Sequence, residues 1–138
     1  MKKEFIYNFK VYYEDTDAGG VVYYANYLKF LERARSEAIY SIGFSNLDLK
    51  RTNDVIIVVK SCNINYIRPA KFEDKLSVNS SIISISKASF KMNQIIIRQE
   101  EKITEAEVVL VAINSSGKPT KLPEELLKKF NSQNLNHL

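Results

Sequence analysis

Closely spaced runs of β-branched and aromatic residues fill the chain from residue 55 onward and leave no room for helices between them. Each run is bounded by turn or charged residues, as strands are. The charged segment 98–102 suits a hairpin and the segment 68–70 needs only a bend, so we expect neighbouring strands to be antiparallel. The runs are Val55–Val59, Ile64–Ile67, Leu76–Ile85, Phe90–Ile97 and Val108–Ile113.

The chain before these runs has a different pattern, one strand followed by one long helix. Residues 5–13 alternate between apolar and more polar side chains, which predicts a half-buried strand. From about residue 23 to residue 42 apolar side chains recur at three- and four-residue spacing, which predicts a helix with Gly43 at its C-terminal cap. Residues 45–53 read as a polar connection with a short helical turn, and a short terminal helix is expected at 124–130.

One long helix covers only one face of a sheet of about five strands. The other face, or an edge, then needs a partner, so we expect a homodimer or a homotetramer. An α+β domain in which an antiparallel sheet of about five strands wraps around one long central helix resembles the hotdog fold. We expect residues 1–130 to form this single domain and residues 131–138 to form a polar C-terminal tail.

The scarcity of histidine excludes many kinds of active site. The only histidine, His137, lies next to the C-terminal end, so the chain cannot build a Ser-His-Asp triad, a Cys-His pair or a histidine-rich metal site. No ligand cluster or G-x-G-x-x-G turn is present, so we expect neither a metal nor a nicotinamide. The lone Cys62 is expected to be a buried, inert thiol. Catalysis would rest on carboxylates, lysines, tyrosines or backbone groups.

The net charge of +4 comes from lysines scattered along the chain rather than from one block. This balance favours an anionic partner, but the absence of a recognition motif or basic stripe speaks against nucleic acid. No apolar stretch approaches the roughly 18 residues of a membrane span, and the N-terminus lacks the apolar run of a signal peptide. We therefore expect a cytoplasmic protein.

Residues 12–28 carry the most specific pattern, YYEDTDAGGVVYYANYL. Carboxylates stand at the end of a strand, glycines let the backbone approach a ligand, and a helix N-terminus with free N–H groups follows. This segment resembles the signature of the 4-hydroxybenzoyl-CoA thioesterase family of hotdog proteins, and within it the short acyl-CoA thioesterases associated with the Tol-Pal system. The resemblance continues in order through residues 30–35, 65–70, 117–119 and 122–126.

The resemblance implies an acyl-CoA thioesterase, which hydrolyses a CoA thioester to a free acid and coenzyme A. It assigns the role of nucleophile or general base to Asp17 and the role of oxyanion donor to the backbone N–H of Tyr24. Coenzyme A is then part of the substrate, and no separate cofactor is expected. The likeness to the Tol-Pal group also implies a peripheral link to envelope or lipid metabolism. Substrate contacts are expected at Gly19, Gly20, Val21, Asn26 and Arg68.

Several residues of this segment have a structural alternative. Glu14, Asp15 and Asp17 are all suited to capping the turn and helix that follow them, and Asp15 is the better structural candidate of the two aspartates. Asn26 either positions the loop or the substrate, or bonds locally near the helix start. Glu32 is either a solvated or ion-paired group or a helix carboxylate that takes part in catalysis.

The identity of the acyl group stays open at this stage. Tyr24 stands where the Tol-Pal-associated proteins usually have histidine, and tyrosine there resembles the 4-hydroxybenzoyl-CoA enzyme instead. A backbone donor survives this change, but the shape of the acyl pocket does not follow from it. The alternative function is a non-catalytic acyl-CoA binding or regulatory hotdog protein. The candidate cations for the phosphates of coenzyme A are Arg68, Lys71, Lys87, Lys91 and Lys118.

Overall fold

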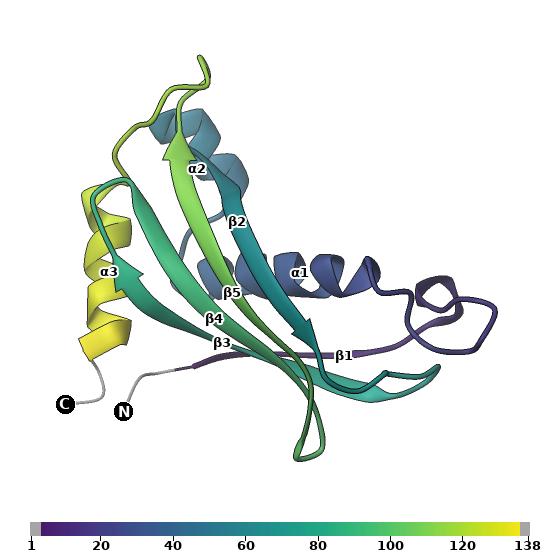
Figure 1. Cartoon of the computed structure of the whole chain (residues 1–138). Coiled ribbons are helices and arrows are strands. Elements are labelled where there is room, and N and C mark those ends of the chain that lie inside the picture. Colours follow the sequence, from purple (N-terminus) through teal and green to yellow (C-terminus); the bar gives the residue numbers. More distant parts are fainter. Residues whose placement is uncertain (1–3, 136–138) are drawn as a thin grey trace.

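The computed structural model describes residues 4–135, so His137 lies outside the described part of the chain. Its antiparallel sheet has the strand order β1-β3-β4-β5-β2 and curls around helix α1 (Figure 1). The strands are β1 (Phe5–Lys10), β2 (Ile56–Tyr66), β3 (Lys75–Ile85), β4 (Ser89–Arg98) and β5 (Glu101–Ile113). The helices are α1 (Asn26–Ser41), α2 (Asn46–Asn53) and α3 (Glu124–Leu135), and a 3-10 turn spans Tyr13–Asp15.

The core lies between α1 and the inner face of the sheet. Every second residue of β3 and β4 is buried there, while the buried residues of α1 recur at three- and four-residue spacing. Phe30 and Leu31 of α1 are almost completely buried, and burial of such a side chain stabilises the fold by about 1.5–3 kcal/mol. The predicted long helix and antiparallel sheet are therefore confirmed. Among residues 4–135 no helix has the length and hydropathy needed to cross a membrane.

The N-terminal strand is shorter than its alternating pattern predicts. β1 ends at Lys10, because the chain then turns through the 3-10 segment, where the Asp15 carboxylate accepts the Tyr12 N–H at 2.9 Å. The long helix begins at Asn26 instead of about residue 23, because residues 21 and 22 are held in isolated β-bridges. The polar loop between β1 and α1 is thereby tied to neighbouring segments at both ends.

The two runs predicted at 55–59 and 64–67 form the single strand β2, with a β-bulge between Val59 and Ser61. β2 pairs with β5, while β3 pairs with β1 and β4, so the connection after β2 is a crossover and not the simple bend expected at 68–70. The prediction of a buried Cys62 is also wrong, because this residue lies on the edge strand β2 and is exposed.

The two shorter helices extend further than expected. α2 has eight residues where a short turn was predicted, because Ser45 Oγ accepts the Asp48 N–H at 3.0 Å and caps the helix start. α3 continues to Leu135, past the expected end at residue 130, so the first part of the predicted polar tail is helical. Gly43 follows α1 with a φ of +92°, which confirms the predicted C-terminal cap.

Candidate active site

The loop that carries Asp17 is closed on itself by backbone hydrogen bonds. The Asp17 N–H donates to the Val21 carbonyl at 2.9 Å, and the Gly20 N–H donates to the Asp17 carbonyl at 3.0 Å. Gly20 has a φ of +80°, a conformation that residues with a side chain rarely adopt. The Val22 N–H donates to the Ala70 carbonyl at 2.8 Å and ties the loop to the crossover between β2 and β3. The loop therefore presents its side chains from a constrained backbone.

The Asp17 carboxylate is exposed, and one of its oxygens is held by the loop. Oδ1 accepts the Gly19 N–H at 2.8 Å, and a Cβ atom at position 19 would lie 3.2 Å from this oxygen. The other oxygen, Oδ2, has no hydrogen-bond partner among the described residues. Asp17 therefore stabilises the turn and still leaves one carboxylate oxygen for a substrate or a water molecule.

Asp15 has a different environment, because it is buried and both its carboxylate and its backbone carbonyl accept hydrogen bonds from neighbouring residues. It is only 7% exposed, and besides the Tyr12 contact its backbone carbonyl accepts the Tyr23 N–H and Asn26 Nδ2, both at 2.9 Å. Asn26 thereby joins the first residue of α1 to the 3-10 turn. Asp15 and Asn26 therefore have a structural role, because their hydrogen bonds orient the loop relative to the helix.

The start of α1 offers donors that the described part of the chain does not use. No side chain caps this helix, and the backbone N–H of Tyr24 donates to no acceptor within residues 4–135. Of the three loop residues expected to contact substrate, Gly19 and Gly20 donate their N–H groups to oxygens of Asp17 within the loop. The Val21 N–H, like that of Tyr24, has no acceptor in the same part of the chain. Such donors and the positive end of a helix stabilise negative charge.

A hollow of about 280 Å³ lies beside this helix start. Of the expected site residues it brings Tyr24 and Arg68 together, whereas Asp17 and the other loop residues of that expectation do not line it. Arg68 also forms a half-exposed ion pair with Glu101 at 3.4 Å. The hollow is lined by Val22, Tyr24, Tyr27, Tyr66, Ile67, Arg68 and Pro69. Its aromatic walls and single cation make it suited to a ligand with both apolar and anionic parts.

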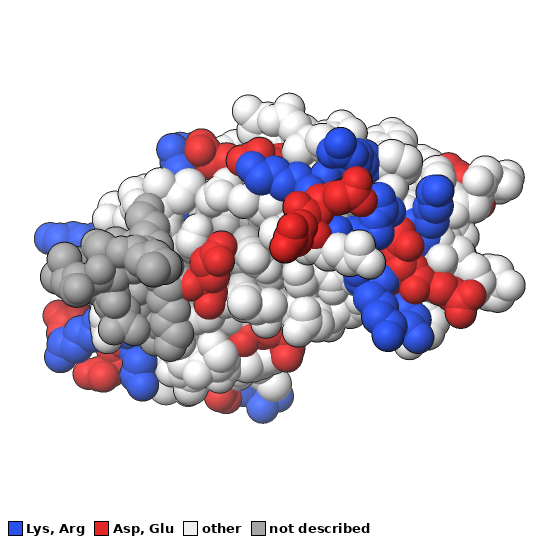
Figure 2. All heavy atoms as spheres, turned by 90° about the horizontal axis from the view of Figure 1, so that it is seen from below, with Lys and Arg blue, Asp and Glu red and all other residues white. Residues whose placement is uncertain are grey.

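The five candidate cations for the coenzyme A phosphates do not gather at one place. Lys71 forms an isolated backbone β-bridge with Val21 and is close to Arg68 in the sequence. Lys91 forms an ion pair with Glu107 at 3.4 Å. Lys87 lies just before β4 and Lys118 lies just after β5. Both are therefore at the far ends of these strands from the Arg98–Glu101 hairpin. On the face shown in Figure 2, Lys and Arg are interspersed with Asp and Glu and form no continuous basic stripe.

Comparison with known proteins identifies the family to which this loop and helix belong. Residues 11–130 match a family model described as the thioesterase-like superfamily. The chain belongs to this thioesterase-like superfamily. It is 39% identical over 123 residues to the acyl-CoA thioester hydrolase YbgC of Escherichia coli, covering 88% of this chain and 91% of that protein.

Solved structures support the same assignment. The crystal structure of a probable thioesterase from Bartonella henselae has a TM-score of 0.84 and 37% identity, over 87% of this chain and 99% of that one. A 1,4-dihydroxy-2-naphthoyl-CoA thioesterase from Synechocystis has a TM-score of 0.87 and 26% identity, over 98% and 99% of the two chains. The hotdog fold and the family resemblance expected from the sequence are confirmed.

Two side chains that sequence reasoning did not single out hold the site of this thioesterase-superfamily chain in place. Tyr27 is buried, its hydroxyl accepts the Ala70 N–H at 3.1 Å, and burial raises the pKa of the phenol. Arg98 donates to Asp74 at 2.7 Å, to the Pro69 carbonyl at 3.1 Å and to Glu101 at 3.2 Å. The hydrogen bond to Asp74 raises the pKa of Arg98 above its ordinary value.

The sequence carried little signal for either role. Tyr27 fits the apolar pattern of the helix, so its hydroxyl contact was not visible, and Arg98 reads as one of several charged turn residues. Residues 4–135 contain no group of three histidine, cysteine, aspartate or glutamate side chains suited to hold a metal ion. The chemistry available at the loop is that of a carboxylate and backbone donors.

Proposed function

We propose that this thioesterase-superfamily chain hydrolyses an acyl-CoA thioester to a free acid and coenzyme A, with Asp17 as nucleophile or general base. The observation that carries the proposal is the pairing of two features. An exposed carboxylate has one oxygen fixed by Gly19 and one free, and the helix start that follows has an unused N–H at Tyr24. The Escherichia coli relative is named an acyl-CoA thioester hydrolase, which agrees with this chemistry.

The two parts of the site act on different atoms of the thioester. Attack on the carbonyl carbon moves negative charge onto the carbonyl oxygen, where the Tyr24 N–H stabilises it, an effect worth about 2.7–4 kcal/mol per donor in other enzymes. As nucleophile, Asp17 would form a mixed anhydride, release the thiolate of coenzyme A and be regenerated by water. As general base, it would take a proton from the attacking water. Neither route needs a histidine.

In this proposal the coenzyme A part of the substrate would lie in the hollow beside Tyr24. Arg68 lines it and Lys71 lies nearby, so both are candidates to pair with phosphate oxygens. The Val21 N–H, in the loop before α1, is a donor without an acceptor in the described part of the chain. Asn26, the first residue of α1, orients the helix start through its hydrogen bond to the Asp15 carbonyl. These residues would position the thioester between Asp17 and Tyr24.

We also propose that the active form is a homodimer or homotetramer in which copies meet along β2. β2 is an edge strand of 11 residues with an exposed central part, whereas the opposite edge strand β1 has only six residues. Val59 and Tyr66 of β2 are 47% and 46% exposed. A long edge strand with exposed apolar side chains is a ready surface for pairing with another copy.

A hydrolysis screen over short, long and aromatic acyl-CoAs, which follows release of the free thiol, tests the proposed activity. We expect turnover of at least one class by the purified chain. The alternative is a non-catalytic acyl-CoA binding protein. The hydrogen bond from the Gly19 N–H to Asp17 Oδ1 favours this alternative, because it gives the carboxylate a structural role. Binding of acyl-CoA with no hydrolysis of any thioester would support that alternative.

A further inference from the structure

Two lysines lie directly opposite each other where β1 ends and β3 begins (Figure 1). Lys10 is the antiparallel partner of Lys75, and both are exposed on the outer face of the sheet, because the residues beside them in each strand face the core. Opposite side chains have Cβ atoms about 4.5–5.5 Å apart, so like charges there destabilise the pairing. The backbone keeps the two lysines in this position, since the following Val11 N–H donates to the Asp74 carbonyl at 3.0 Å.

This pair of like charges is an exception among the described strands. The only other charged residues that stand directly opposite each other there are Arg98 and Glu101, which have opposite charges and form an ion pair at 3.2 Å. Neither Lys10 nor Lys75 forms an ion pair with a carboxylate within residues 4–135. Asp74, the carboxylate next to Lys75, is paired with Arg98 at 2.7 Å. The fold therefore brings two positive charges together without supplying a negative one.

An open hollow of about 640 Å³ lies at these lysines, and we call it the lysine hollow. Asn8 and Ser77, which are opposite each other, form the next row on the same face, and Gln99 of the hairpin after β4 also lines the hollow. No carboxylate is among the described residues of its wall. Its lining is also separate from the Asp17 loop and from the hollow beside Tyr24.

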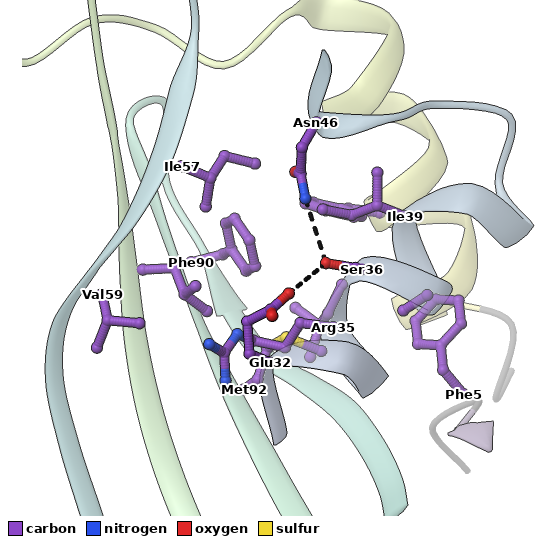
Figure 3. Close-up of a pocket in the computed structure, with 14 residues that line it drawn as sticks. Phe5, Glu32, Arg35, Ser36, Ile39, Asn46, Ile57, Val59, Phe90 and Met92 are labelled. Atoms are coloured by element: carbon purple, nitrogen blue, oxygen red, sulfur yellow. Dashed lines mark hydrogen bonds between the residues drawn. The ribbon is translucent and has the colours of Figure 1, made fainter. Parts of the chain in front are cut away.

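The hollow between α1 and the sheet, drawn in Figure 3, has a different distribution of charge. It is lined by one acidic and one basic residue, and both have partners inside the chain. Glu32 accepts the Ser36 hydroxyl at 2.7 Å, and Arg35 donates to Gln94 Oε1 at 3.1 Å. The lysine hollow holds charge of one sign only, so an anion is attracted there without repulsion from a carboxylate in the same wall.

We propose that the lysine hollow binds a small soluble molecule with a phosphate monoester group, which lies between the ammonium groups of Lys10 and Lys75. Such a group carries a charge of about −1.5 to −2 at neutral pH and three strong acceptor oxygens, so it neutralises both lysines at once. The Ser77 hydroxyl and the amides of Asn8 and Gln99 are further donors in the same wall. The volume is in the range of small-molecule sites, and binding here does not depend on thioester hydrolysis.

Calorimetric titration of the full chain with glycerol 3-phosphate, beside dimethyl phosphate and glycerol at equal ionic strength, tests the proposal. Dimethyl phosphate is a diester with a single negative charge, and glycerol has none. Glycerol 3-phosphate should bind at least about tenfold more tightly than dimethyl phosphate, because only the monoester balances both ammonium groups. Glycerol should show no binding.

Substitution of either lysine should weaken this binding without loss of stability. Lys10→Gln and Lys75→Gln should each weaken glycerol 3-phosphate binding by about tenfold or more, whereas Lys75→Arg keeps the charge and should retain most of it. Without ligand, both glutamine variants should melt at or above the temperature of the unaltered chain, because they remove the repulsion between like charges. Lys50→Gln is the matched control, since it removes an exposed lysine of α2 that forms no ion pair in the described part of the chain and does not line the hollow.

Several results would overturn the proposal: no binding of glycerol 3-phosphate, equal binding of the monoester and the diester, or equal weakening by the Lys10, Lys75 and Lys50 changes. Binding to vesicles that contain phosphatidate, without binding of glycerol 3-phosphate, would replace the small molecule by a membrane surface. Coenzyme A also carries a phosphate monoester, so a raised KM for acyl-CoA in Lys10→Gln would assign the lysines to the substrate site instead. Asp17→Asn should bind glycerol 3-phosphate like the unaltered chain, which separates this site from hydrolysis.

Discussion

Asp15 and Asp17 lie two residues apart, yet the fold uses them in different ways. The carboxylate of Asp15 is buried and closes a turn, whereas that of Asp17 is exposed and keeps one oxygen free. The same residue type, at two positions of one short segment, therefore has two different environments. This difference makes a paired substitution informative, because asparagine preserves the size of each side chain and much of its hydrogen bonding.

We expect Asp17→Asn to lower thioester turnover by orders of magnitude while the protein stays folded, because the change removes the charge needed to attack a carbonyl or to deprotonate water. Asp15→Asn should cost much less turnover. Turnover and thermal melting are measured for both variants. An Asp17→Asn enzyme with more than about a tenth of the original turnover, a deficit under roughly 1.4 kcal/mol, would contradict the catalytic assignment.

Tyr27 links the first turn of α1 to the crossover segment, and its buried phenol should make stability depend on alkaline pH. Because burial raises its pKa in the folded state, the unfolded chain loses this proton first, near pH 10. The contribution to stability is therefore constant below about pH 10 and is lost as the pH rises towards the higher folded pKa.

Tyr27→Phe should show both consequences of this contact. It leaves the Ala70 N–H without its acceptor, which is expected to lower the free energy of unfolding by about 1–3 kcal/mol at neutral pH. Its stability should then fall less steeply above pH 10 than that of the unaltered chain. Chemical denaturation at a series of pH values from neutral to alkaline measures both, and parallel curves for the two proteins would exclude the assigned pKa shift.

At the scale of elements, the site depends on how the crossover after β2 is fastened to the sheet. Arg98, at the end of β4, bonds to Asp74 and to the Pro69 carbonyl, and the same segment supplies the Ala70 carbonyl that holds Val22 of the loop. The hairpin end of β4 thus supports the loop through one intermediate segment. No part of this chain of contacts is local in sequence.

Arg98 and Arg68 should therefore respond differently to removal of their charge. Arg98→Gln is expected to lower the free energy of unfolding by about 1.5–3 kcal/mol, because its bond with Asp74 is largely shielded from solvent. Arg68→Gln removes a half-exposed pair with Glu101 and should change stability by less than about 1 kcal/mol, but raise KM for acyl-CoA. Denaturation and steady-state kinetics on both variants separate the two roles, and a KM unchanged in Arg68→Gln would exclude its contact with substrate.

At the scale of the whole molecule, the exposed edge of β2 predicts self-association. Sedimentation at micromolar concentration should show a dimer or tetramer. Cys62, the sole cysteine of the sequence, lies near the middle of β2 and provides a direct probe. A bifunctional thiol reagent should link two chains through it, and Cys62→Ser should abolish the link without changing the sedimentation. A stable folded monomer that is never crosslinked would argue against pairing along β2.

Local pattern in the sequence was enough for the long helix, its glycine cap and three of the strands, because periodicity and turn residues act within a few positions of each other. The motif around Asp17 likewise indicated the family, since the order of its residue types is specific.

The sequence by itself determined the types of most elements and the position of the carboxylate loop, whereas the tertiary structure decided which strands pair and which polar groups are buried. The exposure of Cys62 and the crossover after β2 depend on the place of that strand at the edge of the sheet. The contacts of Tyr27 and Arg98 join residues far apart in the chain. Such contacts arise only when packing of the core brings distant segments together, so no local pattern encodes them.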